Sequence, residues 1–223
     1  MIFSRRGDKA LSLRLHTLAT YYNNTSVIYD IGCDHGLLGL SFASRDEVRE
    51  IYLVDPSPLV IRSLRQNIKT SHIPRGNLSI NINQEEGQNL QLSPSPKCIF
   101  IAGMGGKEIG EILLSLQSQL LDHDRVVISP HRNILELRKT LSTTELGLVS
   151  ESVLEEDGHF YLILVLEKRD NLPNVTPFGT YLWQTAVGKA YLNKELRHFG
   201  LHQDALSRAY VEYLLSLLAA CND

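Results

Sequence analysis

Glycines and acidic residues alternate directly after an apolar run near the N-terminus. The run Val27–Ile31 carries Asp30, and Gly32, Asp34 and Gly36 follow at a spacing of two. A strand that turns through glycines into a helix start is the usual way in which an α/β protein holds a nucleotide-like ligand. The pattern D-x-G-x-D-x-G is not G-x-G-x-x-G, which disfavours a nicotinamide dehydrogenase. An acid at the strand end suits the cationic amino group of S-adenosylmethionine (SAM), and a tight turn without a ligand is the alternative.

Further acids and glycines follow the later strand-like runs. Asp55 ends the second run, where a carboxylate binds ribose hydroxyls, and Glu85-Glu86-Gly87 follows the third, where adenine needs a polar partner. The fourth run leads into a glycine-rich loop that leaves room for a cofactor or substrate. We therefore expect these residues at the cofactor: Asp30, Gly32, Asp34, Asp55, Glu86, Gly87, Gly103, Met104 and Gly105.

Basic and polar residues form the candidate substrate contacts. The fifth strand-like run is followed by His131, Arg132 and Asn133, which would lie near the reacting edge. Cations also gather near the N-terminus and in one later helix, where they would hold phosphates or form a solvated helix face: Arg5, Arg6, Lys9, Arg14, Arg138 and Lys139. Of these, Arg14 is expected at the cofactor as well.

Alternating strand-like and helix-like segments predict how these residues are positioned. Strands are expected at 27–31, 50–55, 78–83, 98–102 and 125–129, and helices at 8–22, 37–44, 56–69, 107–117 and 134–142. Five strand–helix units of this kind favour a mostly parallel sheet with helices on both faces. The carboxyl ends of its strands share one edge, which is where open α/β folds bind their ligands.

The pattern changes after residue 147. Two strand-like runs, 148–156 and 159–167, flank Asp157-Gly158, which is a strong hairpin signal. A linker at 170–180 precedes apolar residues at helical spacing between 181 and 220, interrupted near Gly200, which indicates a helical hairpin. We therefore expect a Rossmann-like domain over 1–170, whose mostly parallel sheet ends in an antiparallel pair, and a helical extension over 171–223.

Bulk composition excludes several classes of protein. The 223 residues are 43% apolar and 21% charged with a formal net charge of −3, which is ordinary for a globular protein and does not announce a nucleic-acid binder. The three cysteines, Cys33, Cys98 and Cys221, form no C-x-x-C pair, so a reducing compartment and no metal are expected. The chain has neither an apolar run that would span a membrane nor a secretory leader, so the expected location is the cytoplasm.

Three motifs resemble those of one known family. Asp30-Ile-Gly-Cys-Asp-His35, Ile101-Ala-Gly-Met-Gly-Gly106 and Leu154-Glu-Glu-Asp-Gly-His-Phe-Tyr161 are similar to motifs of the bacterial tRNA (adenine-22) N1-methyltransferases, the TrmK family. Leu11–Leu15 resembles its N-terminal helix and Phe178–Leu182 the start of its C-terminal helices, so the resemblance covers nearly the whole chain in the same order. One difference is Ser129-Pro130-His131, where the family often has Gln-Pro-Asn.

The resemblance implies a class I methyltransferase domain, SAM as donor, tRNA as acceptor and a coiled-coil-like C-terminal extension. Gly32, Asp34 and His35 match its SAM turn, Asp55 takes the ribose position and Glu86-Gly87 stands where the family often has Asp-Gly. N1 of adenine carries a lone pair, so attack needs positioning more than deprotonation. A carboxylate or neutral imidazole would stabilise the cationic product, and Asp34, His35 and His131 are the catalytic candidates.

Two other functions remain open from the sequence. One is a SAM-dependent methyltransferase that acts on a small molecule or a protein, which the acidic net charge favours slightly. The other is a non-catalytic RNA-binding protein that keeps the fold, against which the intact set Asp30, Gly32 and Asp55 argues. The expected assembly is a monomer or a weak dimer.

Overall fold

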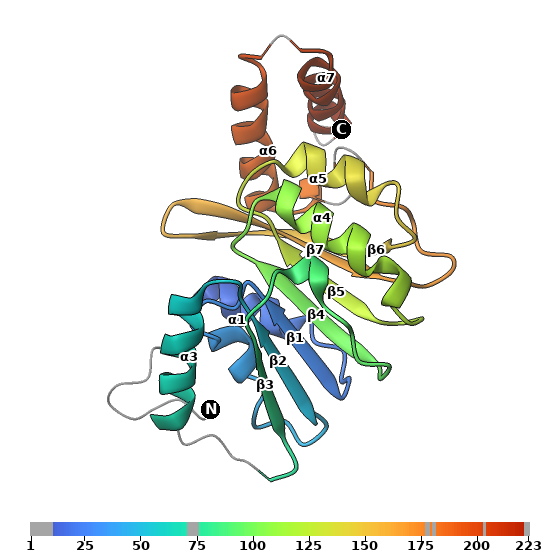
Figure 1. Cartoon of the computed structure of the whole chain (residues 1–223). Coiled ribbons are helices and arrows are strands. Elements are labelled where there is room, and N and C mark those ends of the chain that lie inside the picture. Colours follow the sequence, from blue (N-terminus) through green and yellow to red (C-terminus); the bar gives the residue numbers. More distant parts are fainter. Residues whose placement is uncertain (1–10, 71–75, 177–178, 180–181, 203, 221–223) are drawn as a thin grey trace.

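Seven strands form one sheet in the order β3-β2-β1-β4-β5-β7-β6 (Figure 1). The computed structural model describes residues 11–70, 76–176, 179, 182–202 and 204–220. Strands β1 to β5 are parallel, and β7 is antiparallel to both β5 and β6. The strands are β1 Val27–Ile31, β2 Glu50–Val54, β3 Ser79–Asn83, β4 Lys97–Ala102, β5 Arg125–Ser129, β6 Gly147–Glu156 and β7 His159–Glu167. The predicted mostly parallel sheet with an antiparallel end is confirmed.

Helices cover both faces of the sheet. The α-helices are α1 Leu13–Thr20, α2 Leu37–Leu40, α3 Pro58–Thr70, α4 Gly106–Leu116, α5 Ile134–Leu141, α6 Ala186–Phe199 and α7 Ala205–Ala220, and short 3₁₀ turns are η1 Gly87–Asn89, η2 Gln117–Gln119 and η3 Leu182–Gln184. No helix in these ranges is long and apolar enough to cross a membrane.

Successive side chains of β1 point to opposite faces of the sheet and so belong to different parts of the core. All five residues of β1 are buried, as the central strand of a parallel sheet requires. Ile28 joins the cluster that contains residues of α1, α2 and α3, whereas Tyr29 joins the cluster of α4, α5 and the C-terminal helices. Tyr29 also stacks on Tyr52 of β2, with ring centroids 4.4 Å apart.

The hairpin between β6 and β7 turns at the predicted Asp157-Gly158 pair. Both residues have positive φ, +53° and +75°, which is the conformation that a two-residue turn of this type needs. The strands are paired from Glu156 and His159 back to Gly147 and Glu167, with one irregularity near Leu148 and Ser150. The hairpin prediction is therefore confirmed.

Three predictions about the helices differ from the structure. Among the described residues, the helix expected over 8–22 runs only from Leu13 to Thr20, with Ser12 as its N-cap. The helix expected over 37–44 ends at Leu40, because the chain then tightens into i→i+3 hydrogen bonds, from Phe42 N to Gly39 O at 3.2 Å and from Ala43 N to Leu40 O at 3.1 Å. The connection from β3 to β4 contains only η1, so there are not five strand–helix units. Gly87 is buried there, and a Cβ would lie 2.8 Å from Ile31 and 2.9 Å from Ile112, which leaves no room beside α4.

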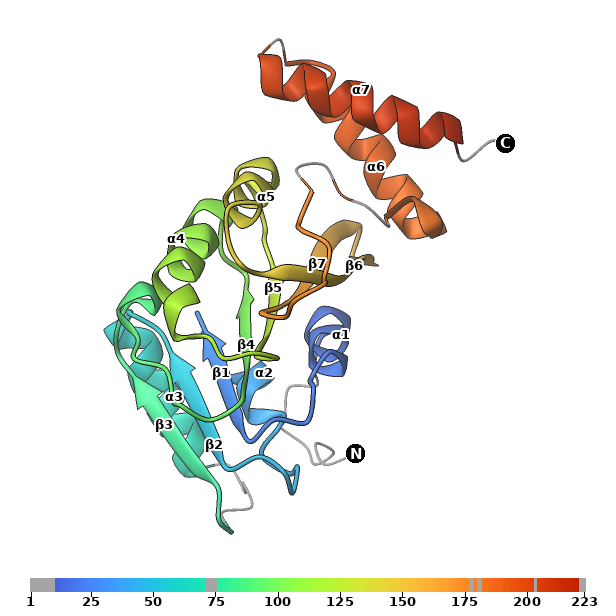
Figure 2. The same cartoon turned by 90° about the vertical axis from the view of Figure 1, so that its right-hand side faces the viewer.

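The C-terminal helices α6 and α7 lie beyond the β6–β7 end of the sheet, at the opposite end of the molecule from β3 (Figure 2). Tyr191 of α6 packs edge-on against Phe160 of β7, with centroids 6.1 Å apart. The segment before the helices also joins the sheet, since Leu148 N donates to Pro173 O at 2.7 Å. The helical hairpin has the expected place in the chain, and the division at residues 170 and 171 stays a prediction.

A buried ion pair attaches α5 to β6. The guanidinium of Arg138 donates to Glu151 Oε2 at 2.6 Å, and the two side chains are 2% and 0% exposed. Arg138 also donates to Thr176 O at 3.3 Å. The expectation that Arg138 binds phosphate or lies on a solvated face is therefore wrong. Its partner Glu151 lies on β6, and the spacing of residues on the helix does not reveal that contact. Lys139, in contrast, is exposed.

Candidate active site

The turn after β1 is built from residues in the left-handed backbone region. Gly32, Asp34 and Gly36 have φ of +72°, +46° and +70°. Every second residue of this turn is therefore in the left-handed region. The turn is fixed to β2, because the amides of Gly32 and Cys33 both donate to Val54 O, at 2.8 and 3.1 Å. A Cβ on Gly36 would lie 2.6 Å from Leu64, so this position has no room for a side chain.

Asp30 lies beneath this turn as a buried acid. Its side chain accepts a hydrogen bond from the amide of Gly39 in α2 at 2.8 Å, and the residue is only 4% exposed. Burial raises the pKa of Asp30 to about 7, opposed by the Gly39 hydrogen bond and assisted by the charges of Asp34 and Asp55. A cation beside Asp30 would therefore favour the ionised form of its carboxyl group.

A cavity of about 510 Å³ opens at the carboxyl edge of the strands, above this turn. Its wall combines the turn after β1, the end of β2, the loop after β4 and the start of α1. The lining residues are Arg14, Leu15, Asp30, Gly32, Cys33, Asp34, His35, Leu37, Leu38, Asp55, Pro56, Ala102, Gly103, Met104 and His131. The structure therefore brings together predicted residues that are spread over more than a hundred positions of the sequence.

The predicted acids differ in how they lie around this cavity. Asp55 accepts a hydrogen bond from Ser57 N at 2.9 Å, which fixes its side chain at the start of α3. Asp34 is on the rim with 71% of its side chain exposed, and His35 Nε2 lies 3.7 Å from Asp34 Oδ2. Glu86 is the exposed N-cap of η1, and Gly87 is its buried first residue. Neither is among the residues that line the cavity.

A second cavity of about 340 Å³ adjoins the first. It is lined by Gly103, Met104, Gly105, Glu108, His131 and Arg132, and it shares Gly103, Met104 and His131 with the larger cavity. Two loops form it, because His131 N donates to Met104 O at 2.9 Å and Gly106 N donates to Arg132 O at 2.7 Å. A Cβ on Gly106 would lie 2.3 Å from the backbone oxygen of Asn133, so the loops can approach this closely only at a glycine.

Glu108 is a site residue that the sequence did not reveal. Its Oε1 accepts a hydrogen bond from Arg132 at 3.2 Å, whereas its Oε2 is buried with no hydrogen-bond partner among the described residues. The backbone amide of Glu108 and the Arg132 guanidinium hold the pKa of the Glu108 carboxyl below its usual value. The ionised Glu108 carboxylate therefore lines the second cavity, with Oε1 paired to Arg132 and Oε2 buried.

Arg14 is held at the mouth of the first cavity by two distant segments. Its guanidinium contacts His131 Nε2 and lies over the ring of Tyr161, 5.0 Å from the centroid. Glu156 accepts hydrogen bonds from the backbone amides of Leu13 and Arg14, which caps the start of α1. Nothing in the sequence around Glu156 and Tyr161 shows that α1 packs against this hairpin, so neither residue is predicted at the site.

His131 forms the boundary between the two cavities. Burial, and then the nearby charge of Arg14, lower the pKa of His131. The imidazole is therefore neutral at neutral pH, and the Arg14 guanidinium can donate to a free lone pair on Nε2. A carboxylate or a neutral imidazole is expected to stabilise a cationic product, and His131, beside Gly103 and Met104, supplies a neutral imidazole.

The remaining predicted residues lie outside the two cavities or outside the described part of the chain. Asn133 is exposed at the N-cap of α5 with φ of +56°. Arg5, Arg6 and Lys9 precede residue 11 and therefore lie outside the described residues. Over the ranges that the structure describes, no group of three or more His, Cys, Asp or Glu residues could hold a metal ion. Burial raises the pKa of the Cys33 thiol.

The strand order, the turn after β1 and the cavity at the carboxyl edge define a SAM-dependent methyltransferase domain. Residues 11–164 match the family described as "Methyltransferase domain". The chain is 30% identical over 160 residues to the tRNA (adenine(22)-N(1))-methyltransferase of Bacillus subtilis, a match that covers 72% of this chain and 66% of that relative, slightly less than two thirds of its length.

Solved structures show the same fold. The crystal structure of the B. subtilis m1A22 tRNA methyltransferase TrmK has a TM-score of 0.74 at 24% identity, over 97% of this chain and 100% of that one. A Streptococcus pneumoniae putative tRNA (m1A22) methyltransferase in complex with S-adenosyl-L-methionine gives 0.72 at 22% identity, over 96% and 98%. The chain belongs to the methyltransferase domain family and, within it, to the TrmK family.

Proposed function

We propose that this protein transfers the methyl group of SAM to N1 of the adenine at position 22 of tRNA. The observation that carries the proposal is the pair of adjoining cavities that share Gly103, Met104 and His131. A transfer between two substrates needs two sites that meet at one boundary, so that the reacting atoms are held in line. The larger cavity has the groups for the donor, and the smaller one has the groups for a base.

The residues of the larger cavity fit SAM. Buried Asp30 suits its cationic amino group, Asp55 suits the ribose hydroxyls, and Arg14 at the mouth suits the carboxylate. Gly32 leaves space that a side chain would fill, because a Cβ there would lie 3.0 Å from Met104 Sδ. When bound, SAM supplies an electrophilic methyl group.

The residues of the smaller cavity suit an adenine. The Glu108 carboxylate lines this cavity, and because Oε2 is buried, Oε1 is the oxygen that can accept a hydrogen bond from the exocyclic N6 amino group. Its negative charge also opposes the positive charge that develops on the base when N1 is alkylated. The neutral imidazole of His131 stands at the boundary, where it can orient the base without adding a second cation to that of Arg14.

N1 lies on the pairing edge of adenine, so the target base must be unpaired or flipped out before it enters the smaller cavity. Exposed Arg132 borders that cavity and pairs with Glu108, which places a cation where the backbone of the extruded nucleotide arrives. Asp34 and His35, on the rim of the larger cavity, remain catalytic candidates with His131.

The test is methyl incorporation from labelled SAM into an unmodified tRNA transcript, followed by mass spectrometry of the nucleosides. We expect 1-methyladenosine in the transcript and none in a matched transcript that carries guanosine at position 22. Label in the guanosine transcript would move the target to another position. Label in a metabolite or protein extract, with none in tRNA, would favour the other acceptor classes. No SAM binding at millimolar concentration by calorimetry would favour a non-catalytic RNA-binding protein.

Two variants assign the catalytic role. We expect His131→Ala and Asp34→Ala to lower kcat by roughly a hundredfold or more if the group acts in proton transfer or charge stabilisation. Turnover within a factor of a few of the unsubstituted protein would exclude that role for the residue concerned. We also propose that the protein works in the cytoplasm and is a monomer or weak dimer; cell fractionation and sedimentation check these two proposals.

A further inference from the structure

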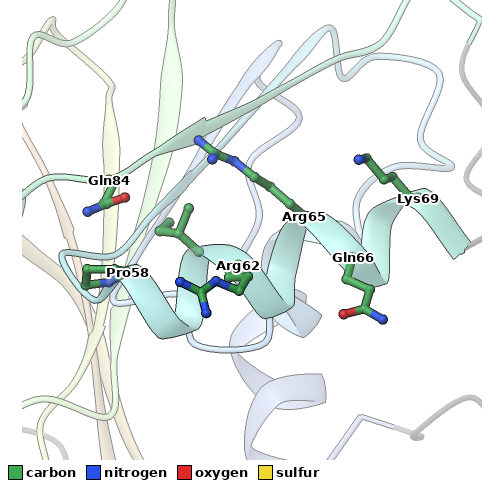
Figure 3. Close-up of a pocket in the computed structure, with 7 residues that line it drawn as sticks. Pro58, Arg62, Arg65, Gln66, Lys69 and Gln84 are labelled. Carbon is green, nitrogen blue, oxygen red and sulfur yellow. The ribbon is translucent and has the colours of Figure 1, made fainter.

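A second polar pocket lies along α3, outside the two cavities of the active site (Figure 3). It has a volume of about 450 Å³ and is lined by Pro58, Ile61, Arg62, Arg65, Gln66, Lys69 and Gln84. Figure 3 shows Arg62, Arg65 and Lys69 leaving the same helix, with Pro58 and Gln84 near its N-terminal end. We call these seven residues the α3 basic surface.

The three cations of this surface are unpaired within the described part of the chain. Among the described residues, neither arginine nor Lys69 forms an ion pair, and all three side chains are exposed. The sequence of α3, PLVIRSLRQNIKT, contains no acidic residue. The three positive charges are therefore not balanced by an acidic residue of the same helix, although the whole chain has a net charge of −3.

The α3 basic surface is connected to the active site through the backbone. Helix α3 begins at Pro58, three residues after Asp55, and Gln84 follows the last residue of β3 at the same carboxyl edge of the sheet. Leu64, on the buried side of the helix, lies against the turn at Gly36. From Arg62 to Lys69 the helix rises by about 10 Å away from that edge.

We propose that the α3 basic surface binds backbone phosphates of the tRNA acceptor, an inference that rests on the proposed function. Arginine and lysine side chains that are exposed, unpaired and spread along a helix give sequence-independent contacts to phosphate, which position the nucleic acid rather than identify its bases. None of the described residues that line the pocket is aromatic, so the pocket offers no ring on which a base would stack. Contacts here orient the tRNA relative to the carboxyl edge where the base is methylated.

The experiment measures tRNA affinity against salt for the triple variant Arg62→Gln, Arg65→Gln, Lys69→Gln. Each lost phosphate contact reduces the log–log salt slope by about 0.7–0.9, so we expect the loss of three to reduce it by about 2–3 and to weaken binding roughly tenfold at low salt. A second variant, Arg62→Lys with Arg65→Lys, keeps the charges and should stay close to the unsubstituted protein. SAM affinity, measured by calorimetry, should be unchanged in both.

The matched control removes three exposed or partly exposed cations at the opposite edge of the sheet, through Arg49→Gln, Lys168→Gln and Arg169→Gln. Its salt slope should match that of the unsubstituted protein. If the unsubstituted protein binds and methylates tRNA but the α3 triple variant has the same slope as the control, the α3 inference is wrong and the proposed function stands. If the unsubstituted protein binds SAM but does not bind tRNA, both are wrong. An equal loss in the control also overturns the inference, because it would reflect net charge alone.

Discussion

The guanidinium of Arg14 lies over the ring of Tyr161, 5.0 Å from its centroid, although the two residues come from opposite ends of the methyltransferase domain. The same guanidinium contacts His131 at the boundary of the two cavities. The hairpin β6–β7 therefore takes part in positioning a cation that lines the larger cavity, which its sequence motif does not disclose.

Tyr161→Ala should weaken SAM binding, because Arg14 loses the ring that holds it at the mouth of the cavity. A cation–π contact of about 0.5–1 kcal/mol corresponds to a roughly two- to fivefold higher Kd. Tyr161→Phe keeps the ring face and should bind SAM as the unsubstituted protein does. Calorimetric titration with SAM checks both variants, and equal affinities for the alanine and phenylalanine variants would show that the ring does not position Arg14.

Glu156→Ala should destabilise the protein, since it removes the acceptor for two backbone amides at the start of α1. Loss of such a cap costs about 1 kcal/mol, which corresponds to a fall in Tm of roughly 2–4 °C for a chain of this size. The neighbouring Glu155 is exposed, so Glu155→Ala is the matched control and should change the free energy of unfolding by less than about 0.5 kcal/mol. Differential scanning calorimetry that gives both variants the same Tm would refute the cap.

SAM binding should depend on pH through Asp30, whose pKa is raised to about 7 by burial. Below that pH the carboxyl is protonated in the free protein, whereas the cationic amino group of SAM favours the ionised form. Binding therefore releases a proton, and affinity should rise as pH increases from about 5.5 to 7; it should fall again once the amino group deprotonates near 8.

The Asp30→Asn variant tests this assignment. It should bind SAM more weakly and lose the rise in affinity between pH 5.5 and 7, because the amide does not titrate. Calorimetry in two buffers of different ionisation enthalpy counts the protons released. Parallel pH profiles for Asp30→Asn and the unsubstituted protein would assign the titration to another group.

Gly106→Ala should disrupt the contact between the two loops that form the smaller cavity. The new Cβ would lie 2.3 Å from the backbone oxygen of Asn133, which cannot move without displacing the start of α5. We expect a loss of stability of roughly 2–4 kcal/mol, within the range for overpacking and backbone strain. Gly76→Ala is the control, since a Cβ there meets nothing within 4 Å; urea unfolding that places the two variants together would contradict this account.

The sheet could be predicted because its signals are local. Buried parallel strands such as β1 and β4 appear as apolar runs, and the turn residues Asp157 and Gly158 adopt the positive φ that their types favour. The acids at the carboxyl edge followed from the same strand assignments, which is why Asp30 and Asp55 were expected at one cavity.

The rest depended on contacts between distant segments. Arg138 sits on a helix whose spacing cannot show that Glu151 of β6 is its buried partner. Glu108 lines the smaller cavity, which forms where Gly105 and Gly106 let two loops approach one another. The early end of helix α2 has a local cause instead, because the chain tightens into i→i+3 hydrogen bonds after Leu40.

The turn after β1 contains two kinds of position: residues 32, 34 and 36, which have a left-handed backbone, and the residues between them. The even-numbered residues hold the backbone path, so replacing them changes the shape of the whole entrance. Cys33 and His35 alternate with them and contribute side chains to the same wall. Of these two, Cys33 is buried in the core, whereas the His35 side chain is 49% exposed, so His35 is the position at which the wall can change without disturbing the packing. A library randomised at codon 35 is therefore the economical route to new donor analogues.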